Sequence, residues 1–334
     1  MSQIEVDKII PQSGTTLTVG DSGDTITIPS GVTLSNSGTT TIAGNLSVDS
    51  GTIKLDGNYP TGTGNNALGD TALDSVEAGG NYNVAIGDHA GTAITTGDIN
   101  LAIGSCALET STTASANIAV GSEALRNNTS GSSNTAVGVA ALCANTTGGN
   151  NIALGRSALV KNTEGDCNTA VGGSNALACN TTGNSNTALG HSALCSNTTA
   201  SNNTAVGKES LCSNTTGATN VAVGLCALKA NTTADDNTSI GGQTLSANTT
   251  GARNTALGQG ALFTNTTASN NTALGRHALL LNTTGASNVA VGHISLDANT
   301  TGIQNVGVGF CSLTTNTTGA SNVGIGPLAL ASNT

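Results

Sequence analysis

Short segments of alternating small and aliphatic residues recur along most of the chain. Most read asparagine, a β-branched residue or leucine, alanine, an aliphatic residue and glycine, as at 83–87, 134–138 and 288–292. Because side chains alternate between the two faces of a strand, each segment is predicted to be a short β-strand. The segments end at the anchor glycines Gly69, Gly87, Gly104, Gly121, Gly138, Gly155, Gly172, Gly190, Gly207, Gly224, Gly241, Gly258, Gly275, Gly292, Gly309 and Gly326. Thirteen of the fifteen intervals between them are 17 residues and two are 18, so the chain repeats one unit sixteen times.

The two faces of these strands differ in side-chain size. The first residue after the anchor asparagine is Thr, Val, Ile or Leu in fifteen copies, and the third is always Leu, Val or Ile. This apolar column suits a core or an interface. The residue between them is alanine in thirteen copies, and with the anchor glycine it forms a small-residue face that another backbone can approach closely. We therefore predict an interchain face that includes Ala136, Ala205 and Ala273.

The rest of each repeat supplies turns. A leucine follows most anchor glycines by four residues, as in Leu142, Leu194 and Leu279, and predicts a second short strand that returns to the core. Three residues later comes Asn-Thr-Thr, often followed by glycine, as at 145–148. These residues favour a turn, and asparagines stacked in adjacent coils can hydrogen-bond to one another.

A 17-residue coil with two short strands and two turns is typical of a β-solenoid or β-roll. We predict an all-β solenoid of sixteen coils over residues 61–334. Residues 1–60 contain short alternating strands between Gly/Ser turns, as in 16–19 and 25–28, and are predicted to form a separate β-rich docking or shaft segment.

Composition and charge narrow the functional classes. Charged residues make up 8% and aromatic residues about 1% of the chain, which also has 45 glycines. With nine Lys and Arg residues and a formal net charge of −10, the sequence predicts no nucleic-acid partner and no binding to anionic membranes. No apolar run reaches the roughly 18 residues of a membrane-spanning helix. The N-terminus has no pattern of a secretory signal, so we expect folding in the cytoplasm of the producing cell.

The sequence offers no catalytic constellation and no cofactor motif, and we predict a protein that is not an enzyme. His89, His191, His277 and His293 all follow an anchor glycine by one or two residues. We interpret them as surface turn residues, with a metal site on an oligomer axis as the alternative. The pair Asp235–Asp236 is interpreted as solvated turn chemistry.

The eight cysteines show no zinc-ligand spacing. We interpret them as small hydrophobic residues in a reducing compartment. Cys195 and Cys212 are 17 residues apart, which would bring their Cα atoms on adjacent coils into disulfide range, although we expect both to stay reduced.

The unit at 83–87, Asn-Val-Ala-Ile-Gly, resembles the repeat in the heads of trimeric autotransporter adhesins. This resemblance covers residues 65–334 and implies a β-roll in which three parallel chains lie side by side. The present sequence differs in its longer Asn-Thr-Thr-Gly loop and in lacking a recognisable signal peptide, coiled-coil stalk and membrane anchor.

Residues 1–60 instead resemble the N-terminal regions of tail-fibre proteins from marine bacteriophages, especially those of cyanobacteria. That resemblance implies a virion protein assembled in the host cytoplasm, joined to other tail proteins through its N-terminal segment and directed at a host receptor. We thus expect a homotrimeric phage tail fibre that takes part in host attachment. A cell-surface trimeric adhesin head and an ice-binding β-solenoid with threonine columns are the alternatives.

Overall fold

The structure is a computed structural model that describes residues 62–333. The predicted docking or shaft segment at 1–60 lies outside the described residues. Within the described range the chain contains strands, turns and bends but no helix, which confirms the predicted all-β solenoid.

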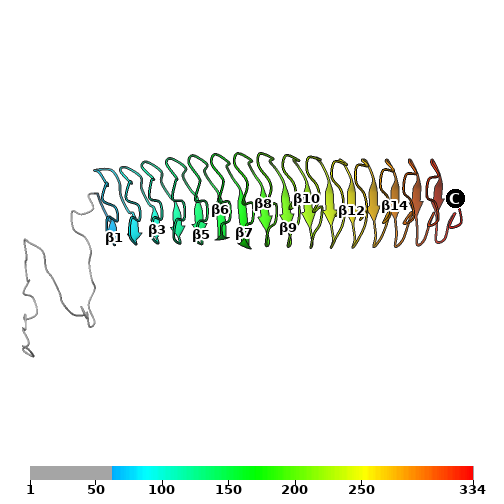
Figure 1. The fold of residues 1–334 in the computed structure, drawn as a ribbon, viewed down its shortest axis with the longest axis horizontal. Coiled ribbons are helices and arrows are strands. Elements are labelled where there is room, and N and C mark those ends of the chain that lie inside the picture. The colour runs from blue at the N-terminus through cyan, green and yellow to red at the C-terminus, as the bar shows by residue number, and fades with distance from the viewer. Residues whose placement is uncertain (1–61, 334) are drawn as a thin grey trace, which may run out of the picture. The chain divides into compact units, whose positions relative to one another are not determined.

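Sixteen parallel strands form one sheet in which each strand pairs with its neighbours in sequence. The coils that carry them stack in a single column (Figure 1). The strands are β1 (Asn66–Leu68), β2 (Val84–Ile86), β3 (Leu101–Ile103), β4 (Ile118–Val120), β5 (Thr135–Val137), β6 (Ile152–Arg156), β7 (Thr169–Ser174), β8 (Thr187–Leu189), β9 (Thr204–Val206), β10 (Val221–Val223), β11 (Thr238–Ile240), β12 (Thr255–Leu257), β13 (Thr272–Leu274), β14 (Val289–Val291), β15 (Val306–Val308) and β16 (Val323–Ile325).

Equivalent repeat positions pair with one another throughout the sheet. Ala205 of β9, for example, lies opposite Ala222 of β10. The register shifts only between β6 and β7, where Arg156 pairs with Ser174 after Leu154 has paired with Val171. This shift absorbs the extra residue that follows Gly172 in one of the 18-residue intervals.

Each coil has one strand, so the predicted second strand at the leucine is wrong. Leu142, Leu194 and Leu279 lie in turns and each has a φ of 52°. This left-handed conformation is unfavourable for leucine by about 1–2 kcal/mol, and it turns the side chain into the coil, where it is fully buried. Because leucine rarely adopts a positive φ, the sequence pattern favoured an extended conformation.

The core of each coil is small. In most coils it holds the strand alanine, a second alanine or hydroxyl residue three positions after the anchor glycine, and the leucine that follows, as in Ala136, Ala141 and Leu142. In the second coil Gly91 replaces this leucine, and Ile94 is buried instead.

The strand and the leucine on the opposite side of the coil lie very close together. A Cβ atom added at Gly307, which occupies the strand-alanine position in β15, would lie 2.7 Å from Oγ of Ser295, 3.0 Å from Oγ of Ser312 and 3.2 Å from Cδ1 of Leu296. In this coil even an alanine at the strand position would be crowded.

The predicted interchain face is therefore wrong. Ala136, Ala205 and Ala273 each have 0% exposure within a single chain. Their small size serves packing against the leucine wall of their own coil, so they do not contact another chain. The first and third residues of each strand point outward instead, because strand side chains alternate in direction.

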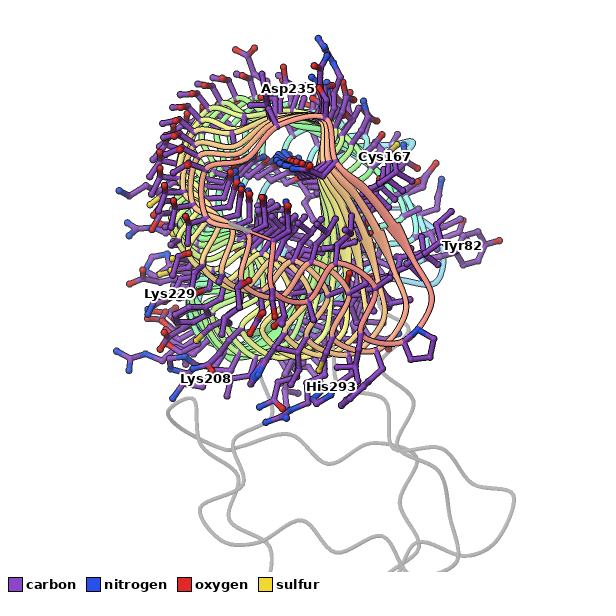
Figure 2. The ribbon with its side chains drawn as sticks, turned by 90° about the vertical axis from the view of Figure 1, so that its right-hand side faces the viewer. Tyr82, Cys167, Lys208, Lys229, Asp235 and His293 are labelled. Atoms are coloured by element: carbon purple, nitrogen blue, oxygen red, sulfur yellow. The ribbon has the colours of Figure 1, made fainter. Side chains whose placement is uncertain are left out.

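Two columns of asparagine side chains run inside the stack. In the first, formed by the anchor asparagines, the Nδ2 amide of Asn100 donates to Oδ1 of Asn83 at 3.0 Å and to the carbonyl of Ala114 at 2.9 Å. In the second, Nδ2 of Asn145 donates to Oδ1 of Asn128 at 2.8 Å. Figure 2, which looks along the stack, shows nitrogen and oxygen atoms aligned inside the coil. These ladders satisfy buried amides and fix the coils in register.

Candidate functional site

The anchor glycines lie where each strand ends and the following turn begins. Gly224 has a φ of +134°, and a Cβ added to it would lie 2.5 Å from the carbonyl oxygen of Gly241 in the next coil. Gly138 and Gly275 have the same conformation and the same close contact. Only glycine adopts this backbone region readily. The close approach that these glycines permit is between coils of one chain.

The outward face of the sheet is an uncharged apolar stripe. It is made of the first and third residues of each strand. Of its thirty-two side chains, twenty-four are aliphatic, seven are threonine and one is Asn66. Many are substantially exposed, as are Leu189 at 46%, Ile240 at 38% and Leu257 at 47%. A continuous exposed apolar surface of this length is unusual on a monomer.

Charged side chains lie on other sides of the coil. Figure 2 shows Lys208, Lys229 and Asp235 pointing outward from separate parts of the circumference. Lys229 contacts Glu209 at 2.7 Å, and this hydrogen bond lowers the pKa of the Glu209 carboxyl and raises that of the Lys229 ammonium.

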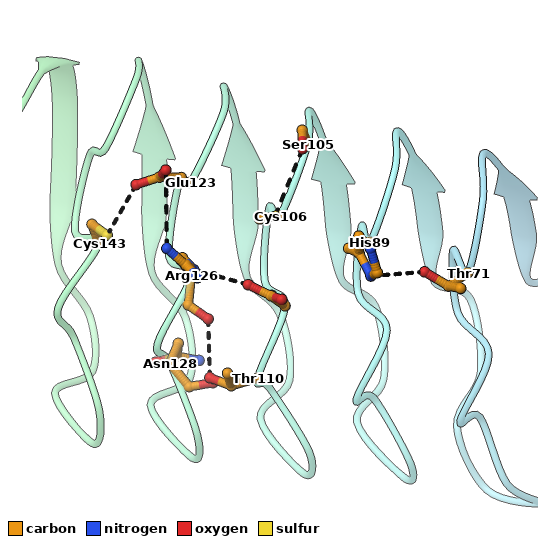
Figure 3. Close-up of polar contacts among 10 residues, drawn as sticks. Thr71, His89, Ser105, Cys106, Thr110, Glu123, Arg126, Asn128 and Cys143 are labelled. Carbon is orange, nitrogen blue, oxygen red and sulfur yellow. Dashed lines mark hydrogen bonds and ion pairs between the residues drawn. The ribbon is translucent and has the colours of Figure 1, made fainter.

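A second charged group joins two adjacent coils. Arg126 donates from Nε to Glu109 at 2.8 Å and lies 3.9 Å from Glu123 (Figure 3). The hydrogen bond to Glu109 raises the pKa of Arg126. Exposed pairs of this kind stabilise a fold weakly, and they keep this side of the stack hydrated while the stripe carries no charge.

The histidines are spread along the stack. His293 stacks on Phe310, with ring centroids 5.8 Å apart, and its Nε2 lies 3.3 Å from Nη1 of Arg276. Burial lowers the pKa of His277, with Arg276 as a further cause. Between residues 62 and 333, no three His, Cys, Asp or Glu side chains gather closely enough to hold a metal ion.

The acidic pair in the loop binds backbone and hydroxyl donors of the preceding coil. Oδ1 of Asp235 accepts from the amide of Ala218 at 2.7 Å, and Oδ1 of Asp236 accepts from the hydroxyl of Thr219. Both aspartates are exposed. They therefore join successive loops of the stack.

Two cysteines stand out from the other six. Cys195 and Cys212 occupy the same position in adjacent coils, and their Sγ atoms are 2.7 Å apart. The 17-residue spacing in the sequence pointed to this pair. It did not reveal that a cavity lies beside Cys195, lined among others by Lys161, Cys179 and Ser196.

Comparison with models of known protein families and with curated protein sequences found no match. In the described part of the chain, no helix has the length and apolar character needed to cross a bilayer. We therefore base the proposed function on the geometry of the coils and on the exposed surfaces of the solenoid.

Proposed function

We propose that this chain is a structural, non-enzymatic subunit of a bacteriophage tail fibre that projects from the virion and takes part in host-cell attachment. Each coil adds about 4.8 Å to the length of a solenoid, so the number of repeats sets the length. This property suits a spacer. Sixteen such coils extend about 75 Å. The assignment to a phage rests on the likeness of residues 1–60 to tail-fibre N-terminal regions, which would join the subunit to other tail proteins.

The observation that carries the structural role is the uncharged apolar stripe. With sixteen strands at about 4.8 Å and a width of three residues, it offers on the order of 700 Å². A typical stable interface uses about 800 Å² per partner. Its side chains recur once per coil, so a surface with the same period matches it along the whole length. A parallel copy of this chain has that period.

We propose that the stripe of each chain faces its partners in a parallel homotrimer of about 97 kDa, three times the chain mass of 32.3 kDa. Native mass spectrometry of the full chain tests the stoichiometry. A mass of two chains would leave the stripe as the interface and contradict the trimer. A stable, soluble monomer would contradict both.

The tail-fibre role is tested separately by immunogold labelling of virions from a host that carries this gene. Gold on the tail supports the proposal. Gold confined to the envelope of uninfected cells would contradict it and favour the cell-surface adhesin.

One observation favours a second candidate, an ice-binding solenoid. Seven of the sixteen first strand positions of the outward stripe are threonine, and several lie on adjacent strands, as in Thr187 and Thr204 on β8 and β9 and Thr255 and Thr272 on β12 and β13. Rows of exposed threonines on adjacent coils are the kind of surface that such proteins use. Thermal hysteresis in a solution of the monomeric chain would support this candidate, and its absence would remove it.

A further inference from the structure

The thiols of Cys195 and Cys212 are held side by side by the coil backbone. The amide of Ser196 donates to the carbonyl of Cys212 at 3.1 Å, and the Cys195 thiol itself lies 3.3 Å from that carbonyl oxygen. Adjacent coils at about 4.8 Å put the two Cα atoms within the range of about 4.4–6.8 Å seen in disulfides. An Sγ–Sγ separation of 2.7 Å leaves well under 1 Å of movement to reach a bond of about 2.05 Å.

We propose that Cys195 and Cys212 form a thiol–disulfide exchange site that accepts a small anionic disulfide and ends as an intrachain disulfide between adjacent coils. This inference is independent of the fibre role.

The surroundings give a small molecule access to Cys195. A cavity of about 350 Å³ opens beside it, lined among others by Lys161, Asn175, Cys179 and Ser196. Asn175 and Cys179 belong to the coil with the extra residue after Gly172. The ammonium of Lys161, 4.0 Å from Sγ of Cys179, puts a positive charge at the cavity. A peptide disulfide with free carboxylates, such as oxidised glutathione, has the complementary charge.

The exchange proceeds in two steps. The Cys195 thiolate attacks one sulfur of the disulfide RSSR, forming a mixed disulfide and releasing RS⁻. Cys212 then loses its proton to solvent and attacks the Cys195 sulfur, which forms the Cys195–Cys212 bond and releases the second RS⁻. The two cysteines are oxidised by two electrons, and RSSR is reduced to two thiols.

Electrostatics support Cys195 as the attacking group. A hydrogen bond from Cys212 lowers the pKa of Cys195 to about 6, and the pKa of Cys212 is raised because its proton is held in that bond. Cys143 lies at the same coil position, but its neighbours along the stack are Arg126 and Val160. Burial raises the pKa of Cys143, and this residue provides a matched control.

The test treats the folded full chain with oxidised glutathione and measures intact mass and the number of alkylatable thiols. We expect the mass to fall by two hydrogens, with a loss of two alkylatable thiols that peptide mapping assigns to Cys195 and Cys212. The variant Cys143→Ser should lose the same two thiols. In Cys212→Ser, the glutathionyl adduct should persist on Cys195 because no resolving thiol remains.

Three results would overturn the proposal. These are a persistent adduct on the unmodified chain, equal modification of several cysteines, or a disulfide that links other residues. If Cys212→Ser fails to fold by circular dichroism, the unmodified chain and Cys143→Ser still decide the outcome.

Discussion

Asn231 donates a side-chain hydrogen bond to Oδ1 of Asn214 in the preceding coil at 2.9 Å, and also donates to the carbonyl of Ala234 at 3.0 Å. Its own Oδ1 accepts from Asn248 in the next coil. One buried amide thus satisfies three groups, none of which has access to water.

Replacing Asn231 with alanine should destabilise the stack by about 2–4 kcal/mol, because it leaves buried polar groups on both neighbouring coils without partners. Urea unfolding followed by circular dichroism measures the loss. Thr233→Ala alters an exposed residue of the same loop and should change stability by no more than about 0.5 kcal/mol. Equal effects of the two substitutions would show that the ladder contributes nothing specific.

Gly224→Ala and Gly242→Ala form a matched pair in two adjacent coils. The first puts a Cβ atom 2.5 Å from the Gly241 carbonyl oxygen at a φ of +134°, whereas a Cβ at Gly242 meets no atom within 4 Å. Gly224→Ala should therefore lower the melting temperature clearly, at a cost of at least about 1–3 kcal/mol, and Gly242→Ala should be close to neutral. If Gly224→Ala melts like the unmodified chain, the turn geometry is wrong.

The outward stripe predicts a second kind of variant. Leu189→Glu, Ile240→Glu and Leu257→Glu together should leave the circular dichroism spectrum unchanged, because these side chains are exposed on the single chain. They should abolish assembly, since three carboxylates per chain would be brought into an apolar interface. The native mass should fall from about 97 kDa to the 32.3 kDa of one chain.

The control for that variant adds the same charges elsewhere on the coil. Thr199→Glu, Thr216→Glu and Thr233→Glu alter exposed loop residues and should leave the native mass at its original value. Loss of assembly in this control, or its survival in the stripe variant, would locate the interface away from the sheet.

The pKa shifts of the cysteines predict different pH profiles for alkylation. The thiolate is the reactive form, so Cys195, with a pKa of about 6, should react at a rate that is nearly constant between pH 7 and 9. Cys143, whose pKa is raised from 9.0, should react faster throughout that interval as pH rises. Labelling with iodoacetamide and mass spectrometry of the peptides separates the two.

Cys212→Ala should return Cys195 to the behaviour of an ordinary thiol, since it removes the hydrogen bond that holds the thiolate. A Cys195 profile that parallels Cys143 in the unmodified chain would contradict the assigned contact.

The repeat was predictable from the sequence because the same structural requirements, for glycine at the turn and for asparagine in the ladder, recur about every 17 residues. Gly224 and most of its equivalents occupy a backbone region that other residues rarely adopt. Asn145 and its equivalents recur from Asn128 onward because each bonds to the next. Such constraints leave the same residue type at the same position in most copies, and the period follows from them.

The direction of the strand faces was not predictable in the same way. Alternation indicates that Thr204 and Val206 share a face and that Ala205 lies on the other, but it does not say which face is inside. Which face is inside depends on how closely the opposite side of the coil approaches the strand. Here Leu211 makes that approach, from a turn in which its φ is 50°. Leucine prefers extended or helical backbone, so the sequence does not indicate that conformation, and it leaves the larger strand side chains in a core or an interface.

The backbone hydrogen bonds between coils, such as Leu211 to Ala227 at 3.0 Å and Thr215 to Thr232 at 2.9 Å, point along the stacking direction. A force that pulls the two ends of the solenoid apart therefore does not shear the sheet as a whole. It detaches one terminal coil at a time, and each detachment frees 17 residues of chain, a gain of about 50 Å in contour length. Under tension the column should yield as a series of equal steps, so that a sudden load is absorbed by outer coils while the remainder keeps its shape.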